Sequence, residues 1–200
     1  SNDGSCYHDV VTDIDGNEYQ AVQIGDQLWM KENLKVTHYR NGDEIPTGLS
    51  GEGYDMSEWA LTTDGAYAVY PYDNWDGIVE SCQGNCAEVY GNLYNGYAVN
   101  DNRNLAPEGW HIPTDDEWQE LVDFLGGNTI AGGSLKESGI EHWESPNTGA
   151  TNESGFTALP GGSRHGGGPA GQYFWIGEEA HFWSKSLNTM ENDYEALVRS

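Results

Sequence analysis

The clearest hydrophobic pattern along the chain predicts a helix that begins after Thr114. Its apolar residues follow one another at spacings of three, one and three, which places them on one helical face: Trp118, Leu121, Val122 and Leu125. Thr114 and Glu117 form a capping box, in which each side chain accepts a hydrogen bond from the backbone N–H of the other residue. Gly126 and Gly127 then end the helix.

Elsewhere the pattern predicts short strands separated by long loops. Val10 and Val11 precede an acidic, glycine-containing turn at residues 13–17, and the β-prone residues after it indicate a hairpin. Three further short elements are expected, a helix over residues 132–138 and strands over 156–159 and 182–186. Residues 41–64 are rich in Gly, Asp and Ser and are expected to be loop. The prediction is a mixed α+β domain whose long ordered loops carry function.

The length of 200 residues is sufficient for one domain with a sizeable core. Hydrophobic residues make up only 36% of the chain, but 8 Trp, 12 Tyr and 4 Phe supply bulky core material. No run of 18 apolar residues occurs, so no direct insertion into a membrane is predicted. We expect one domain over residues 1–200. Because its start lacks a signal-peptide pattern, we expect it to be a module of a larger multidomain protein.

Net charge limits the possible partners, because 8 basic residues stand against 33 acidic ones and give −25 at pH 7. Nucleic acid would repel such a chain, so nucleic-acid binding is excluded. Two explanations remain for the charge: solubility in a salty medium, or acidic loops whose repulsion is offset by bound divalent cations. Both indicate an extracellular location, where calcium is abundant.

The chain has three cysteines, so at least one of them is unpaired within the chain. Cys82 and Cys86 are close enough in sequence to close a small disulfide loop, which suits an oxidising compartment. A zinc site at these cysteines is disfavoured, because no second pair of Cys or His stands at ligand spacing. We therefore predict the disulfide rather than free thiols.

Six motifs occur in one order along the chain: DIDGNEYQAVQIGDQLWMKENLK, YGNLYNGYAV, APEGWHIPTDDEWQELVDFLGG, GSLKESG, HWESPNTGATNESGFTALPGG and FWSKS. Together they resemble the Fibrobacter succinogenes major paralogous domain family, over residues from about 11 to 186. The resemblance implies a C-type-lectin-like fold, also similar to the formylglycine-generating-enzyme fold. Such a fold has two helices against small antiparallel sheets, with long loops at one end. It further implies a surface or secreted bacterial module whose ligand is undefined.

The chain departs from the family pattern in three places. The family's YNWY stands here as Tyr94-Asn95-Gly96-Tyr97, so one aromatic is missing. The usual closing strand is expected to be absent or replaced, because the chain ends without the Arg-Cys pair, and Cys6 is then a partner left behind. A Gly-rich loop over residues 164–168 extends the segment after Pro160.

Enzymatic activity is not predicted. Formylglycine generation requires a pair of reactive cysteines, whereas Cys82 and Cys86 stand in a loop that is unlike that site. The chain has no nucleophile elbow, no phosphate-binding loop and no HExxH motif. His111 and His142 are interpreted as packing residues. An orphan enzyme of the formylglycine-generating type is the least favoured alternative.

Calcium is the predicted cofactor, because Ca²⁺ takes six to eight oxygen ligands and the loops are rich in them. The candidate ligands fall into three groups: Asp73, Asn74 and Asp76; Asn100, Asp101 and Asn102; and Asn147, Asn152 and Glu153. Simple Asx turns explain the first two groups equally well. For the third group, side chains that satisfy backbone groups are the favoured alternative. Asp13, Asp15 and Asn17 begin like an EF-hand loop, but a plain turn is favoured there.

Aromatic and basic residues in the loops are the candidate ligand-binding residues: Tyr72, Trp75, Arg164, His165, Tyr173 and Trp175. Exposed aromatic rings stack on sugars or hold peptide side chains. Arg164 can bind a carboxylate bidentately, and an ordinary ion pair with a nearby Asp is the favoured alternative. The leading hypothesis is a calcium-dependent module of a bacterial adhesin that binds a peptide or glycan on a host or neighbouring cell. The alternative is a structural spacer domain that binds nothing.

Overall fold

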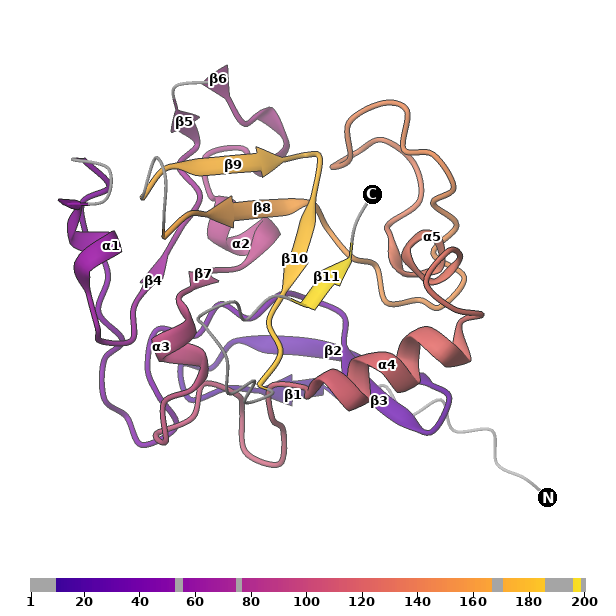
Figure 1. Ribbon diagram of the computed structural model, residues 1–200, viewed down its shortest axis with the longest axis horizontal. Helices are drawn as coiled ribbons and strands as arrows, with labels where there is room; N and C mark the ends of the chain where they lie inside the picture. Colours follow the sequence, from indigo (N-terminus) through magenta and orange to yellow (C-terminus); the bar gives the residue numbers. More distant parts are fainter. Residues whose placement is uncertain (1–9, 53–55, 75–76, 167–170, 186–195, 199–200) are drawn as a thin grey trace.

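The computed structural model describes residues 10–52, 56–74, 77–166, 171–185 and 196–198 (Figure 1). In chain order the elements are β1 (Val10–Thr12), β2 (Glu18–Ile24), β3 (Gln27–Met30), α1 (Glu58–Leu61), β4 (Tyr67–Ala68), β5 (Asp73–Asn74), β6 (Gly77–Ile78), η2 (Glu80–Cys82), α2 (Cys86–Tyr90), β7 (Leu93–Tyr94), α3 (Gly96–Val99), α4 (Asp115–Phe124), α5 (Ala131–Leu135), β8 (Gly161–Arg164), β9 (Tyr173–Ile176), β10 (Ala180–Phe182) and β11 (Ala196–Val198). This is a small mixed α+β domain with few helices and small sheets. None of the helices in the described ranges has the length and apolar character needed to span a bilayer.

The predicted hairpin forms the first two strands of the antiparallel sheet β1-β2-β3. Its turn is held by the carboxylate of Asp13, which accepts hydrogen bonds from the backbone N–H groups of Asp15 and Asn17. The same carboxylate accepts the Tyr19 hydroxyl at 2.7 Å, and burial together with this bond raises the pKa of Tyr19. The carboxylate of Asp13 therefore makes the hydrogen bonds of a plain turn. This is the interpretation that the sequence favours for residues 13–17 over the start of an EF-hand loop.

A second sheet has the strand order β11-β10-β8-β9. Strand β10 runs parallel to β8 and antiparallel to β11, with Ala180 opposite both Gly162 and Val198. Strand β11 adds an edge strand to this sheet near the end of the chain, where the usual closing strand was expected to be absent or replaced. Two small antiparallel pairs, β4-β7 and β5-β6, complete the sheets of the described residues.

Helix α4 confirms the strongest prediction. The Thr114 hydroxyl accepts the Glu117 N–H at 3.3 Å, and the Glu117 carboxylate accepts the Thr114 N–H at 2.8 Å. Trp118 and Leu121 are buried against Trp29 and the segment after α5. The amphipathic face therefore anchors the helix to the first sheet and to the core.

Four predictions from the sequence differ in detail from the structure. Helix α5 ends before Lys136, whose backbone is extended, so it is shorter than the predicted 132–138. Residues 156–159 are not a strand, because Thr157 has φ +62° and only Ala158 bridges Lys136. The predicted strand 182–186 reduces to the end of β10 at Phe182, and residue 186 lies outside the described residues. Helix α1 forms within the predicted loop 41–64.

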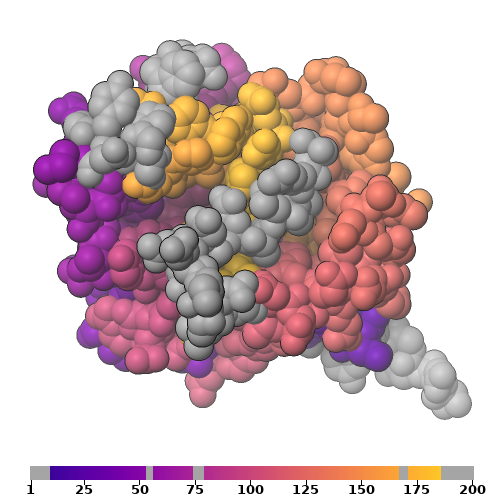
Figure 2. Space-filling view, in the orientation of Figure 1, coloured from indigo at the N-terminus to yellow at the C-terminus, as the bar shows by residue number. Residues whose placement is uncertain are grey.

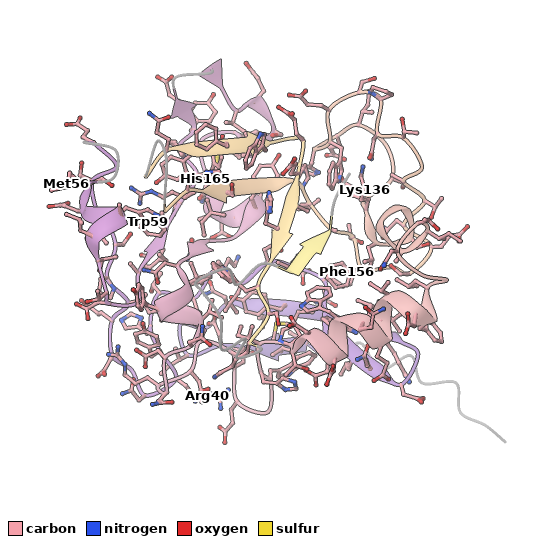
Figure 3. All side chains as sticks on the ribbon, in the orientation of Figure 1. Arg40, Met56, Trp59, Lys136, Phe156 and His165 are labelled. Atoms are coloured by element: carbon pink, nitrogen blue, oxygen red, sulfur yellow. A yellow bond between two sulfur atoms is a disulfide. The ribbon has the colours of Figure 1, made fainter. Side chains whose placement is uncertain are left out.

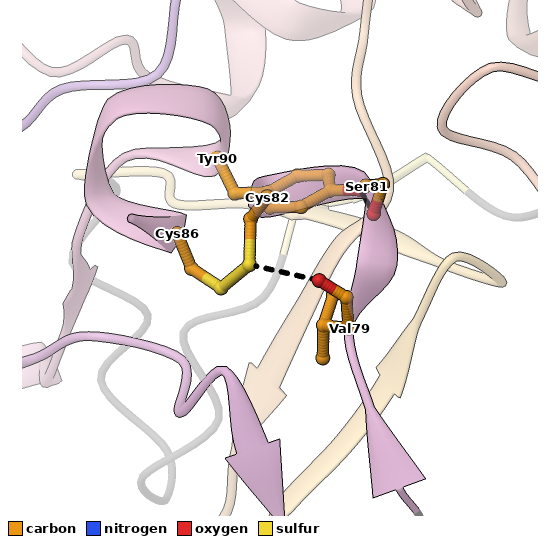
Figure 4. Close-up of a disulfide and its surroundings, with 5 residues drawn as sticks. All are labelled: Val79, Ser81, Cys82, Cys86 and Tyr90. Atoms are coloured by element: carbon orange, nitrogen blue, oxygen red, sulfur yellow. Dashed lines mark hydrogen bonds between the residues drawn. A yellow bond between two sulfur atoms is a disulfide. The ribbon is translucent and has the colours of Figure 1, made fainter. Parts of the chain in front are cut away.

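Cys82 and Cys86 are joined by the predicted disulfide (Figure 4). Both cysteines are buried against the ring of Tyr90, and the Tyr90 hydroxyl lies 2.5 Å from the Ser81 hydroxyl. The bridge therefore ties η2 to the start of α2. Cys6, the third cysteine, lies outside the described residues.

Candidate functional site

Strands β8 and β9 bring together four of the six predicted ligand-binding residues. Arg164 ends β8 directly opposite Tyr173 of β9, His165 follows Arg164, and Trp175 is two residues further along β9. Tyr72 is exposed just before β5, and Trp75 lies outside the described residues. The antiparallel register of β8 and β9, rather than proximity in sequence, creates this grouping.

Arg164 points into the protein. Its guanidinium carbon lies 4.2 Å from the ring centroid of Trp59, which reaches toward β8 from α1 (Figure 3), and 5.0 Å from that of Tyr173. Nε donates to the carbonyl of Gly171 at 3.0 Å, and a terminal nitrogen donates to the carbonyl of Leu49 at 2.6 Å. Burial lowers the pKa of Arg164. The expected ion pair with an Asp is not found among the described residues, and the guanidinium instead clamps two loops.

Trp175 has a backbone conformation that is unusual for a tryptophan, with φ +60°. Gly162, on the neighbouring strand β8, has φ +63°, and a Cβ there would overlap the carbonyl oxygen of Phe174. The two backbones approach closely at this point, and the regular alternation of side chains along β9 is interrupted. The indole of Trp175 consequently stays 37% exposed. Strained residues of this kind cluster at functional sites.

Three rings surround the indole. The ring centroids of His165, Phe174 and His181 lie 4.9, 5.4 and 5.9 Å from that of Trp175. We call these four residues the Trp175 patch. The β9–β10 region lies at the surface on the face shown in Figure 2. Sequence reasoning missed His181, because it comes from β10 and only the parallel pairing of β10 with β8 brings it here.

The second predicted group of calcium ligands follows α3 and makes internal bonds. The side-chain amide of Asn100 donates to the carbonyl of Gly96 at 2.9 Å. Asp101 forms an ion pair with Arg103 at 2.7 Å, and this hydrogen bond holds the pKa of Asp101 below its usual range. The backbone carbonyl of Asn102 accepts the side-chain amide of Asn104. The side chains of Asn100 and Asp101 therefore make the bonds of the turn itself.

Of the first predicted group, Asp73 and Asn74 form the short strand β5, and Asp76 lies outside the described residues. Asp73 is exposed. Asp73 and Asn74 pair with Ile78 and Gly77, respectively, so the backbone here belongs to a small hairpin.

The third predicted group fixes the loop after α5. Asn147 donates its amide to the carbonyls of Glu137 and Gly139 at 2.8 and 2.7 Å. The side-chain oxygen of Asn152 accepts the Thr157 N–H at 2.9 Å, whereas Glu153 is exposed. Asn147 and Asn152 therefore pair with backbone groups, which is the alternative favoured over metal binding for this group.

The comparisons with known proteins identify the family. A sequence model described as the Fibrobacter succinogenes major domain matches residues 22–199. The match begins and ends later than the expected 11–186, and it includes β11 at the end of the chain. No curated protein and no solved structure matches the chain. Because the match covers well over half of the residues, this chain belongs to the Fibrobacter succinogenes major domain family.

Proposed function

We propose that this domain is a ligand-binding module of a bacterial surface or secreted adhesin and that the Trp175 patch is its recognition surface. The observation that carries the proposal is the exposed indole of Trp175, held outward by a left-handed backbone between two imidazole rings and a phenyl ring. No chemical step is proposed for the domain.

A glycan is the ligand class that this surface favours. The flat indole can stack on the C–H face of a sugar ring, as exposed aromatic rings do. The peptide alternative relied on Arg164 as a carboxylate clamp, but the guanidinium already donates to the carbonyls of Gly171 and Leu49. The net charge of −25 further favours a neutral sugar over an anionic one.

We also propose the C-type-lectin-like arrangement and the calcium requirement that the resemblance suggested. Two features support the first: helices α4 and α5 beside small sheets, and long ordered loops between the elements. The acidic composition supports the second, since bound cations would lower the repulsion between loops. A rise in melting temperature with calcium and its reversal by a chelator are the expected results.

A glycan array followed by titration of the best sugar tests the recognition surface. Trp175→Gly removes the indole and suits the left-handed backbone, which offsets part of the packing lost against the three rings, and circular dichroism checks that the variant is folded. We expect it to bind the sugar at least about tenfold more weakly. Tyr97→Ala, which removes another exposed ring on α3, is the matched control and should bind normally. A blank array would support the spacer alternative, and unchanged binding by Trp175→Gly would place the ligand elsewhere.

A further inference from the structure

The loop after α5 brings together three side chains that ligate metals: Glu137, Glu141 and His142. One donor atom from each lies within 4.8 Å of the other two. Glu137 and His142 are mostly buried, with side-chain exposures of 15% and 17%, whereas Glu141 is exposed. His142 was predicted to be a packing residue, and Glu137 and Glu141 were not among the predicted site residues.

The distances within the cluster suit a metal ion. Nδ1 of His142 lies 2.9 and 3.0 Å from the two carboxylate oxygens of Glu137. Two donors that each lie about 2.1 Å from one ion in a tetrahedral site are about 3.4 Å apart. His142 and Glu137 therefore need to separate by only about 0.4 Å to admit an ion between them, and Glu141 is within reach as the third ligand.

The surroundings hold the cluster in place without neutralising it. The ring of His142 packs edge-on against Tyr90 at 5.8 Å between centroids. The neighbouring Lys136 is buried with its ammonium 4.1 Å from the ring centroid of Trp143 (Figure 3), and among the described ion pairs no Lys or Arg contacts Glu137 or Glu141. Among the described ion pairs, Glu137 contacts His142 and no Lys or Arg balances the charge of Glu137 or Glu141.

A second observation points to a missing partner at the same loop. The side-chain oxygen of Asn147 is buried and has no hydrogen-bond partner among the described residues. Its amide nitrogen is anchored to the carbonyls of Glu137 and Gly139, so the unpaired oxygen is held beside the backbone that carries the cluster. Buried acceptors are normally paired, so this oxygen is open to a further polar partner at the loop that carries the cluster.

We propose that Glu137, Glu141 and His142 form a binding site for a divalent transition-metal ion, with Zn²⁺ the preferred ion. Imidazole together with carboxylates suits zinc, whereas calcium prefers a larger shell made of oxygen atoms alone. Three protein ligands leave one position of a tetrahedral site for water or an oxygen of a bound ligand. Because the Glu144 N–H donates to the Gly177 carbonyl at 2.7 Å, the ion would also brace the turn between β9 and β10.

Calorimetric titration of the chelator-treated protein with Zn²⁺ tests this site. We expect one saturable site per chain and a Zn²⁺-dependent rise in melting temperature. Glu141→Gln removes an exposed ligand, so the metal-free protein should keep its melting temperature while zinc affinity falls at least about tenfold. Glu144→Gln, an equal change of charge in the same loop, should bind zinc normally. Bound Co²⁺ should give visible absorption bands that His142→Gln alters, which reports nitrogen ligation directly.

Three results would overturn the proposal. The first is the absence of saturable zinc binding. The second is an equal loss of affinity in Glu141→Gln and Glu144→Gln, which would show diffuse attraction to an acidic surface. The third is calcium binding at this cluster as tight as zinc binding, which would contradict the assigned metal class. None of these outcomes depends on whether the Trp175 patch binds a sugar.

Discussion

Arg164 offers the sharpest test of how the β8–β9 region is built. If the guanidinium clamps the fold, as its contacts with Trp59, Tyr173 and two carbonyls indicate, then Arg164→Ala should destabilise the domain. If instead Arg164 captures a ligand carboxylate, the same substitution should abolish binding and leave stability unchanged. The two roles therefore predict different free energies of unfolding for Arg164→Ala, a decrease if the residue clamps the fold and no change if it binds a ligand.

The magnitude follows from the contacts that are lost. Each hydrogen bond from a charged donor contributes about 1.5–3 kcal/mol, and each ring under the guanidinium contributes about 0.5–1 kcal/mol. These contributions are not additive, and water re-enters at the half-buried site, so we expect a loss of about 2–4 kcal/mol for Arg164→Ala. In a domain of this size the melting temperature should fall by roughly 6–12 °C. Arg164→Lys keeps the charge but not the planar fork, and about half of the loss is expected.

Urea unfolding followed by tryptophan fluorescence provides the assay, since the chain has 8 Trp residues. The expected series of midpoints is parent above Arg164→Lys above Arg164→Ala, with unchanged slopes. An Arg164→Ala midpoint equal to that of the parent would refute the clamp. Loss of carboxylate-peptide binding in that stable variant would then favour peptide capture.

Three further predictions concern local features of the fold. Asp13→Ala should cost about 2–4 kcal/mol in urea unfolding, because it leaves the proton of the buried Tyr19 hydroxyl without an acceptor. The loss should be the same with calcium or a chelator, and a calcium-dependent loss would point to a metal at this turn. Thr114→Ala should cost about 1 kcal/mol by removing the cap of α4, and an unchanged thermal midpoint would contradict the capping box. Arg103 holds the pKa of Asp101 in the folded protein below its value in the unfolded chain. The ion pair therefore stabilises the fold above about pH 4, and this stabilisation is lost as the pH falls through the pKa of folded Asp101. Asp101→Asn should therefore have a lower free energy of unfolding than the parent at pH 7, and this free energy should fall less steeply toward pH 3. Parallel pH profiles of stability for the parent and the variant would exclude the linkage.

The local elements of this fold could be predicted from the chain alone. The cap and apolar face of α4, the turn at Asp13 and the disulfide between Cys82 and Cys86 each depend on residues within a few positions of one another. The hydrogen bonds and contacts that form such elements join residues within about one turn of the chain, so the residues that predict them stand close together in the sequence. Six motifs in order were also sufficient to indicate the family, which the match over residues 22–199 confirms.

Tertiary structure alone decided which distant residues meet. The parallel pairing of β10 with β8 brings His181 to Trp175, and Arg164 finds Trp59 more than a hundred positions away in the chain. The inward turn of Arg164 and the edge strand β11 likewise depend on contacts between distant segments, and a single sequence shows no local period that predicts them. Contacts between distant segments depend on the geometry of the whole chain, because each one is formed only when the intervening loops have been closed.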